Sequence, residues 1–231
     1  MATTTHTPVR TWGDGDRYAL LVHGITADSS SWWRVAPALA ERGYRVLAPD
    51  LPGHGRAPRL DRYTLQDLAD ALVESVPAGP DLAIGHSLGG LLLSLVGERL
   101  KPGRVVYVEP AWNETLESTL REFRCQKEWS PAQVEEAMVR WEPEARKAKV
   151  ASLAQWDPRT LDAIEGLPRR NPGPPGVPGM VVLADPSHMV PPPVARELRA
   201  LDYGVRVVPR SGHVVHQDDF DGFLAAVKDW L

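Results

Sequence analysis

The sequence predicts an α/β fold with a mostly parallel central sheet and helices on both of its faces. Short apolar runs alternate with segments whose apolar residues recur at helical spacing, over residues 7–110 and again over residues 179–231. Such an alternation is typical of a parallel sheet that is covered on both sides. The polar residues suited to chemistry each follow an expected strand at its carboxyl end, where these sheets bind ligands. They are His23, Asp50, Ser87, Glu109, Asp185 and His213.

Composition narrows the class of protein. The 231 residues are 43% hydrophobic, enough for a large core, and α/β chains of this length commonly form one unit. A net charge of −4 gives no reason to expect nucleic acid or an anionic membrane as a partner. No apolar run is long enough to span a bilayer. We therefore expect a small-molecule substrate, no nucleic acid, no membrane, and a monomer or homodimer.

Cysteine usage and the first residues predict a cytoplasmic location. Cys125 is the only cysteine, which rules out an internal disulfide and fits a reducing compartment. We expect its side chain to be a buried apolar filler. Residues 1–8 have neither the basic start nor the apolar core of a signal peptide.

Five strands and three helices are expected before residue 110. The first strand is a short edge strand that ends at the turn 13–16, and the later ones are apolar runs typical of buried strands. The first helix has serine N-caps ahead of it and stops at Gly43, and the second opens at Thr64. The expected strands are 7–12, 18–22, 44–48, 81–84 and 104–108, and the expected helices are 31–42, 64–73 and 90–96.

The alternation stops at residue 111 and resumes at residue 180. Residues 111–166 show no strand pattern, are charged and helix-prone, and include Ser130-Pro131, a typical helix start. The segment 166–178 is dense in proline and glycine and is interpreted as a connector. The break contains Trp112, Trp129, Trp141 and Trp156; after it we expect strands 180–184 and 205–208 and helices 192–201 and 218–231.

One serine lies between an expected strand and an expected helix. Ser87 is flanked by Gly85 and Gly89, and glycines let a strand and a helix approach closely enough to hold a strained turn. This is the G-x-S-x-G pattern of a nucleophile elbow, in which the serine hydroxyl stands at a helix N-terminus. The sequence therefore predicts that Ser87 is a nucleophile.

Four motifs in this order resemble those of the α/β-hydrolase superfamily of serine hydrolases, and the resemblance covers nearly the whole chain. It implies the α/β-hydrolase fold, with residues 1–110 and 179–231 as the core. It also implies a helical cap inserted after the sixth strand, with residues 111–178 forming the cap and its Pro/Gly-rich return linker. The motifs are His23-Gly24, Asp50-Leu51-Pro52-Gly53-His54-Gly55, Gly85-His86-Ser87-Leu88-Gly89-Gly90 and Gly212-His213.

A serine hydroxyl needs a base within hydrogen-bond reach, and histidine titrates near neutral pH. The resemblance places this base between a strand and the final helix, which selects His213 among the seven histidines. His216, one helical turn further on, is the alternative. The others are expected to be structural or have no assigned role, with His23 bracing the loop that follows it: His6, His23, His54, His86 and His188.

The base needs a carboxylate that orients it and stabilises its cationic form. Asp185 is the expected acid, since the order Ser, Asp, His is the one this fold uses. The family often carries the acid a few residues later, where this chain has Ser187, so Glu109 at the end of the preceding strand is kept as the alternative. The resemblance assigns the oxyanion hole to the backbone amides of Ile25 and Leu88.

Residue types at these positions favour acyl transfer. Relatives that open epoxides or displace halide have an aspartate where this chain has Ser87. We expect hydrolysis of a carboxylic ester or lactone of a small apolar or aromatic substrate through an acyl-enzyme, with no cofactor and no metal. The tryptophans of 111–178 could contact that substrate or form the cap's own core. The alternatives are a thioesterase, a C–C bond hydrolase, a cofactor-free perhydrolase, or a binding protein with little turnover.

Overall fold

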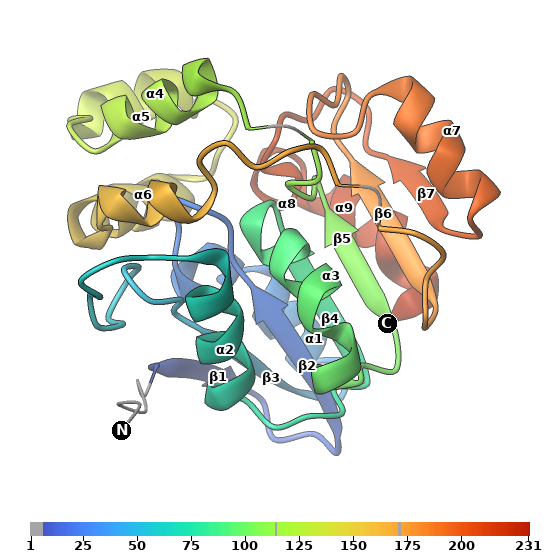
Figure 1. The fold of residues 1–231 in the computed structure, drawn as a ribbon. Helices are drawn as coiled ribbons and strands as arrows, with labels where there is room; N and C mark the ends of the chain where they lie inside the picture. The colour runs from blue at the N-terminus through green and yellow to red at the C-terminus, as the bar shows by residue number, and fades with distance from the viewer. Residues whose placement is uncertain (1–6, 114, 171) are drawn as a thin grey trace.

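The computed structural model describes residues 7–113, 115–170 and 172–231 and has the predicted α/β architecture. His6 lies outside the described residues. The central sheet has seven strands in the order β1-β3-β2-β4-β5-β6-β7 (Figure 1). Only the pairing of β1 with β3 is antiparallel, and each of the other neighbours is parallel. The predicted fold class is therefore confirmed.

The elements follow the predicted order closely. The strands are β1 (Val9–Trp12), β2 (Arg17–Val22), β3 (Tyr44–Pro49), β4 (Leu82–His86), β5 (Val105–Val108), β6 (Gly179–Leu183) and β7 (Gly204–Val207). The α-helices are α1 (Val35–Ala40), α2 (Leu65–Ser75), α3 (Leu88–Leu100), α4 (Glu117–Gln126), α5 (Pro131–Ala137), α6 (Pro143–Gln155), α7 (Pro192–Ala200), α8 (Val215–Asp218) and α9 (Phe220–Val227). Short 3₁₀ turns are η1 (Ser29–Trp32), η2 (Pro158–Ala163) and η3 (Lys228–Trp230).

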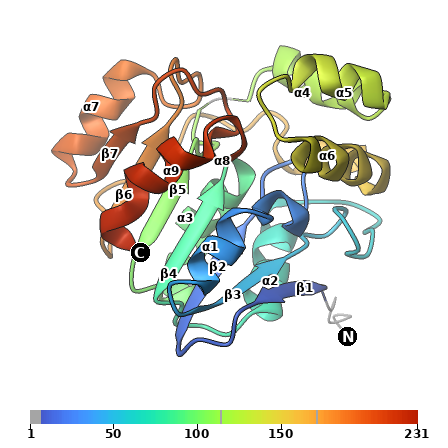
Figure 2. The same ribbon diagram turned by 180° about the vertical axis from the view of Figure 1, so that it is seen from behind.

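Two hydrophobic clusters lie on opposite faces of the sheet. Alternate residues of a strand point to opposite faces, so Leu20 of β2 belongs to one cluster and Leu21 to the other. Helices α2 and α3 cover the first face, and α1 and α9 cover the second (Figures 1 and 2). Burial on both faces explains why β4, β5 and β6 are mostly apolar, and each fully buried leucine contributes about 1.5–3 kcal/mol.

The helical insertion lies between β5 and β6. Within the described part of 109–178 no strand occurs, and α4, α5 and α6 lie beyond the carboxyl edge of the sheet (Figure 1). The insertion follows the fifth strand of this chain, so its expected place after a sixth strand is corrected. The helix start predicted at Ser130 opens α5 with a capping box, in which the Ser130 side chain accepts from the Gln133 N–H. The division into core 1–110 and 179–231 and cap 111–178 stays a prediction.

Two expected helices are interrupted in the structure. The helix expected over 31–42 divides into η1 and α1. The closing helix expected over 218–231 divides at Asp219, whose φ of −149° and ψ of 86° lie outside the helical region. The Asp219 side chain accepts from the Gly222 N–H and so caps α9.

Cys125 is exposed on α4, so its expected burial is wrong. The residue lies on the solvent side of an amphipathic helix whose buried residue is Leu120.

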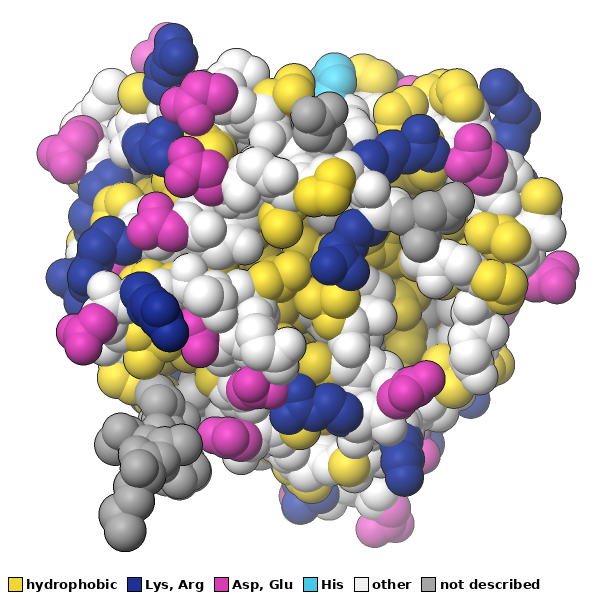
Figure 3. All heavy atoms as spheres, viewed as in Figure 1, with side chains coloured by type: hydrophobic (Ala, Val, Ile, Leu, Met, Phe, Trp, Pro, Cys, Tyr) yellow, Lys and Arg dark blue, Asp and Glu magenta, His cyan; other side chains and the backbone are white. Residues whose placement is uncertain are grey.

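On the face seen in Figure 3, charges of both signs are interspersed around a hollow where hydrophobic side chains gather. Among the described helices, none combines the length and apolarity needed to cross a bilayer.

Candidate active site

Ser87 occupies a strained turn between β4 and α3. Its φ of 50° and ψ of −112° lie in a region that L-residues rarely adopt, and its N–H donates to Val108 O at 2.9 Å. The flanking glycines are required by close approach, because a Cβ on Gly85 would lie 2.6 Å from the Gly89 backbone. A Cβ on Gly89 would lie 2.1 Å from Val22 O. Ser87 is therefore held at the N-terminus of α3, at the carboxyl edge of the sheet.

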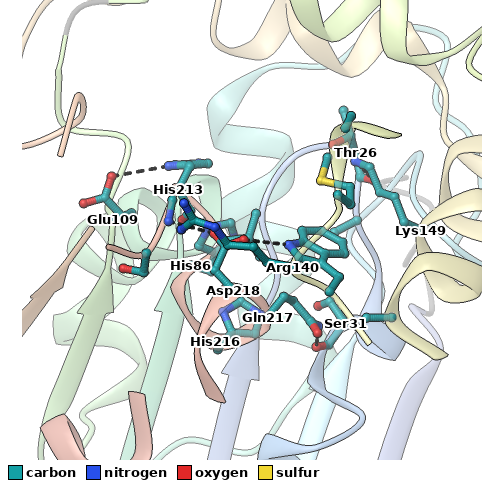
Figure 4. A pocket seen from close by; sticks show the side chains of 18 of the residues that line it. Thr26, Ser31, His86, Glu109, Arg140, Lys149, His213, His216, Gln217 and Asp218 are labelled. Carbon is teal, nitrogen blue, oxygen red and sulfur yellow. Dashed lines mark hydrogen bonds and ion pairs between the residues drawn. The ribbon is translucent and has the colours of Figure 1, made fainter. Parts of the chain in front are cut away.

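His213 pairs with a buried carboxylate. It lies in the loop between β7 and α8, and its Nδ1 is 3.5 Å from Glu109 Oε2 (Figure 4). Glu109 follows β5, is 1% exposed, and has a φ of 44°. Its Oε1 accepts a hydrogen bond from Ala184 N–H at 2.9 Å. The second bond holds the carboxylate across the end of β6, with one oxygen directed at the imidazole.

Asp185, the acid expected from the sequence, lies elsewhere at the same edge. Asp185 is exposed and borders the cavity described below. Its backbone N–H donates to Ser211 O at 3.1 Å. Its carboxylate has no hydrogen bond or ion pair with any described residue, His213 included. The structure thus brings Glu109, and not Asp185, to the histidine.

Ser87 Oγ makes no hydrogen bond to any described residue, so no bond joins it to His213. Catalytic hydrogen bonds are often long in unliganded enzymes and tighten with substrate. The neighbouring His86 joins the turn at Ser87 to the loop that carries His213. Its Nε2–H donates to His213 O at 3.0 Å, and the centroids of the His86 and His213 rings lie 4.8 Å apart. Burial, and then the nearby His213 and His216, hold the pKa of His86 well below its usual value. His86 is therefore neutral and holds the loop between β7 and α8 that carries His213, called the base loop below.

His216, the alternative base, is buried and its ring makes no hydrogen bond to a described residue. Its ring stacks on Trp32 with centroids 4.4 Å apart, and neither ring nitrogen has a partner among the described residues. Burial lowers the pKa of His216 to about 3. Burial likewise lowers the pKa of His54 to about 3, and its Nδ1–H donates to Pro52 O at 3.0 Å. Both imidazoles are structural in this arrangement.

The loop after β2 approaches the elbow. His23 accepts from the Leu51 N–H through Nε2 at 3.0 Å and donates from Nδ1 to Gly24 O at 2.8 Å, which confirms its expected bracing role. A Cβ on Gly24 would lie 3.1 Å from Ser87 Cβ, so the loop passes close to the serine. The N–H groups of Ile25 and Leu88 have no acceptor among the described residues.

A cavity of about 890 Å³ opens between this edge of the sheet and the insertion. Of the four tryptophans in 111–178, Trp141 borders it, whereas Trp112 and Trp156 are buried in the protein core and Trp129 packs against that core. Most of these rings therefore hold the insertion to the sheet. The cavity wall combines residues from both sides, among them Ile25, His86, Glu109, His213, Met138, Trp141 and Lys149.

Sequence patterns did not predict the contacts between the insertion and the loops that carry His213 and Ile25, of which two matter for the cavity wall. Trp141 Nε1–H donates to Asp218 Oδ1 at 3.0 Å, and Asp218 Oδ2 accepts from the Gly212 N–H at 2.8 Å, next to His213. On the other side Lys149 reaches Thr26. The paired residues lie 77 and 123 positions apart, so no local pattern marks them. Within the described ranges, no group of three or more His, Cys, Asp or Glu side chains is arranged to hold a metal ion.

Comparison with known proteins gives one family and one fold. The sequence model of the alpha/beta hydrolase family matches residues 19–226. The probable esterase PIR7A of Oryza sativa subsp. indica is 34% identical over 122 residues, which are 48% of this chain and 46% of that protein. The chain thus spans about half the length of this relative.

Two solved structures share the fold over nearly the whole chain. The esterase EaEST of Exiguobacterium antarcticum superposes with a TM-score of 0.78 at 17% identity and covers 98% of this chain and 95% of its own. The enol-lactonase of Burkholderia xenovorans LB400 gives a TM-score of 0.76 at 22% identity, with coverages of 97% and 95%.

Proposed function

Because the chain belongs to the alpha/beta hydrolase family, we propose that it hydrolyses carboxylic esters through an acyl-enzyme formed on Ser87. One observation supports this most strongly. A serine in a strained turn at the N-terminus of α3 shares the carboxyl edge of the sheet with a histidine that is paired with a buried carboxylate. The relative from rice is a probable esterase, which agrees with this chemistry.

In the proposed reaction Ser87 is the nucleophile and His213 is the general base and acid. Ser87 Oγ attacks the ester carbonyl while His213 Nε2 takes the hydroxyl proton, and the same nitrogen then returns that proton to the leaving alcohol. Water attacks the acyl-enzyme in the second half, with His213 again as base, and releases the acid and free Ser87. The N–H groups of Ile25 and Leu88 stabilise the oxyanion, each such donor contributing about 3–4 kcal/mol to the transition state.

We propose Glu109, and not Asp185, as the acid that orients His213. Its distance of 3.5 Å to Nδ1 and its anchor on Ala184 N–H support this choice over an exposed carboxylate without a partner. The two acids follow neighbouring strands, so the replacement keeps the acid at the same edge of the sheet. A buried carboxylate also faces less competition from water for the imidazolium charge.

The test uses a fluorophosphonate probe and a p-nitrophenyl ester. The parent protein should hydrolyse the ester and be labelled, and Ser87→Ala should lose both properties, because the probe reacts only with an activated serine. Ser94→Ala is the matched control, since Ser94 lies further along α3 and bonds to Leu91 O. Persistent labelling of Ser87→Ala would refute the nucleophile assignment. Slow labelling of the parent without turnover would favour a binding protein.

A further inference from the structure

Lys149 is a buried ammonium group in the cavity wall. It lies on α6 and is 8% exposed. Its Nζ donates to Thr26 Oγ1 at 2.7 Å and to Thr26 O at 3.2 Å, and Figure 4 shows the side chain lying beside Thr26. Thr26 directly follows Ile25, whose N–H is assigned above to the oxyanion. The ammonium is therefore placed next to the part of the site that would hold the ester carbonyl.

This cation has no paired carboxylate. No described acidic group lies within ion-pair distance of Nζ, and the acid that acts on it electrostatically is Asp28. The Asp28 carboxylate is itself engaged, because it accepts from Ser30 N–H at 2.7 Å and from Ser152 Oγ–H at 2.8 Å. Burial lowers the pKa of the Lys149 ammonium to about 7, since the charge is desolvated without a full countercharge.

Two acids at the same cavity, the buried Glu109 and the half-buried Asp218, are satisfied by donors of their own. Glu109 is bound by Ala184 N–H and faces His213, and Asp218 is bound by Trp141 and Gly212. Asp185 also borders the cavity without a partner, but it is exposed to solvent, so Lys149 differs from it in being an unpaired charge that is buried. An ammonium carries three N–H donors, and Thr26 accepts from two of them.

From this arrangement we infer that Lys149 binds an anionic group of the substrate, such as a carboxylate, and makes the protein selective for esters that carry a negative charge near the scissile carbonyl. The anion would supply both the missing acceptor and the missing countercharge. The inference rests on the proposed ester hydrolysis and narrows its substrate class. A neutral ester would leave the ammonium as it is in the free protein.

A second role for the same side chain makes a different prediction. Lys149 also ties α6 to the loop that carries Ile25, so its loss could loosen the oxyanion hole. That loss would lower the turnover of charged and neutral esters by the same factor. Loss of an anion site lowers the turnover of charged esters alone, so the ratio between two matched esters separates the two roles.

The experiment measures kcat/KM for charged and neutral esters of equal length. One series compares half methyl esters of dicarboxylic acids of four to eight carbons with methyl esters of the matching monocarboxylic acids. A second places the carboxylate in the alcohol part, with acetyl esters of hydroxy acids against acetyl esters of simple alcohols. Lys149→Met removes the ammonium, and Lys147→Met is the control, because Lys147 is an exposed residue of α6 paired with Glu144.

We expect the parent protein to prefer the charged ester in at least one series. Lys149→Met should reduce that preference about tenfold or more, the usual size of one charge-assisted hydrogen bond, and Lys147→Met should leave it unchanged. An equal loss for both esters, an unchanged preference, or a parent protein that prefers neutral esters throughout would overturn the inference. Failure of the parent to hydrolyse any ester, together with no labelling of Ser87, would instead refute the proposed function and the inference with it.

Discussion

Replacing Glu109 by glutamine tests the choice of acid most directly. Glutamine keeps the size of the side chain and retains an oxygen for the Ala184 N–H, so the backbone at the end of β6 should be undisturbed. What it removes is the negative charge 3.5 Å from His213 Nδ1. At an effective dielectric constant of about 20, two unit charges 3.5 Å apart attract by roughly 5 kcal/mol, which corresponds to a rate factor between about 10³ and 10⁴.

The assay is the steady-state hydrolysis of a p-nitrophenyl ester at neutral pH by Glu109→Gln and Asp185→Asn. We expect Glu109→Gln to lower kcat by about 10³-fold or more and Asp185→Asn to stay within about twofold of the parent, because the latter carboxylate is exposed and unpaired. Thermal unfolding of both variants checks that neither has lost its fold. A large loss in Asp185→Asn beside an active Glu109→Gln would refute the reasoning and restore Asp185 as the acid.

Two further predictions concern the insertion and the buried histidines. Trp141→Phe removes the N–H that holds Asp218 and should lower kcat several-fold in the same assay. The control is Trp112→Phe, which loses an indole hydrogen bond away from the cavity and should leave kcat unchanged. Equal effects of the two variants would contradict the link between Trp141 and the base loop. The folded-state pKa of His216 is about 3, below its unfolded value near 6.5, so its contribution to stability is complete above about pH 6.5 and is lost as the pH falls toward 3. His216→Phe should therefore reduce the fall in unfolding free energy between about pH 7 and pH 5 by roughly 2 kcal/mol, measured by urea denaturation. The exposed His188→Gln should not change that fall, and an unaltered fall in His216→Phe would contradict the assignment.

Local sequence patterns were sufficient to predict the sheet and the elbow. Each buried strand is a short, mostly apolar run of residues. The two glycines around Ser87 are required by contacts of less than 3 Å. The acid could not be chosen in the same way. Val108 pairs with Val182 across β5 and β6, so Glu109 and Asp185 both follow the ends of neighbouring strands. Which carboxylate reaches the imidazole depends on the backbone turn at Glu109, where φ is 44°, and no sequence pattern marked that turn.

The insertion was predicted as a break in the alternation, but its contacts with the catalytic loops were not. They join Trp141 to the base loop and Lys149 to the loop after β2, across 77 and 123 residues of sequence. Such contacts arise only once the sheet has brought its carboxyl edge under α5 and α6. For the tryptophans the sequence left two roles open, and the structure gives three of the four the packing role, since they hold the insertion in place and do not border the cavity.

On the proposed assignment of catalytic groups, these contacts make the same side chains serve both the substrate cavity and the catalytic geometry. Trp141 and Lys149 both border the cavity, and each also holds a loop that carries a proposed catalytic group. A change in the insertion that accommodates a different substrate would therefore also shift the loop that carries His213 or the loop after β2 that carries Ile25. Because an oxyanion donor acts only when it is correctly placed, a shift of a few tenths of an ångström there would lower kcat and not only KM. Replacing Cys125 by serine, at an exposed position of α4 that does not border the cavity, carries no such coupling and should leave both constants unchanged.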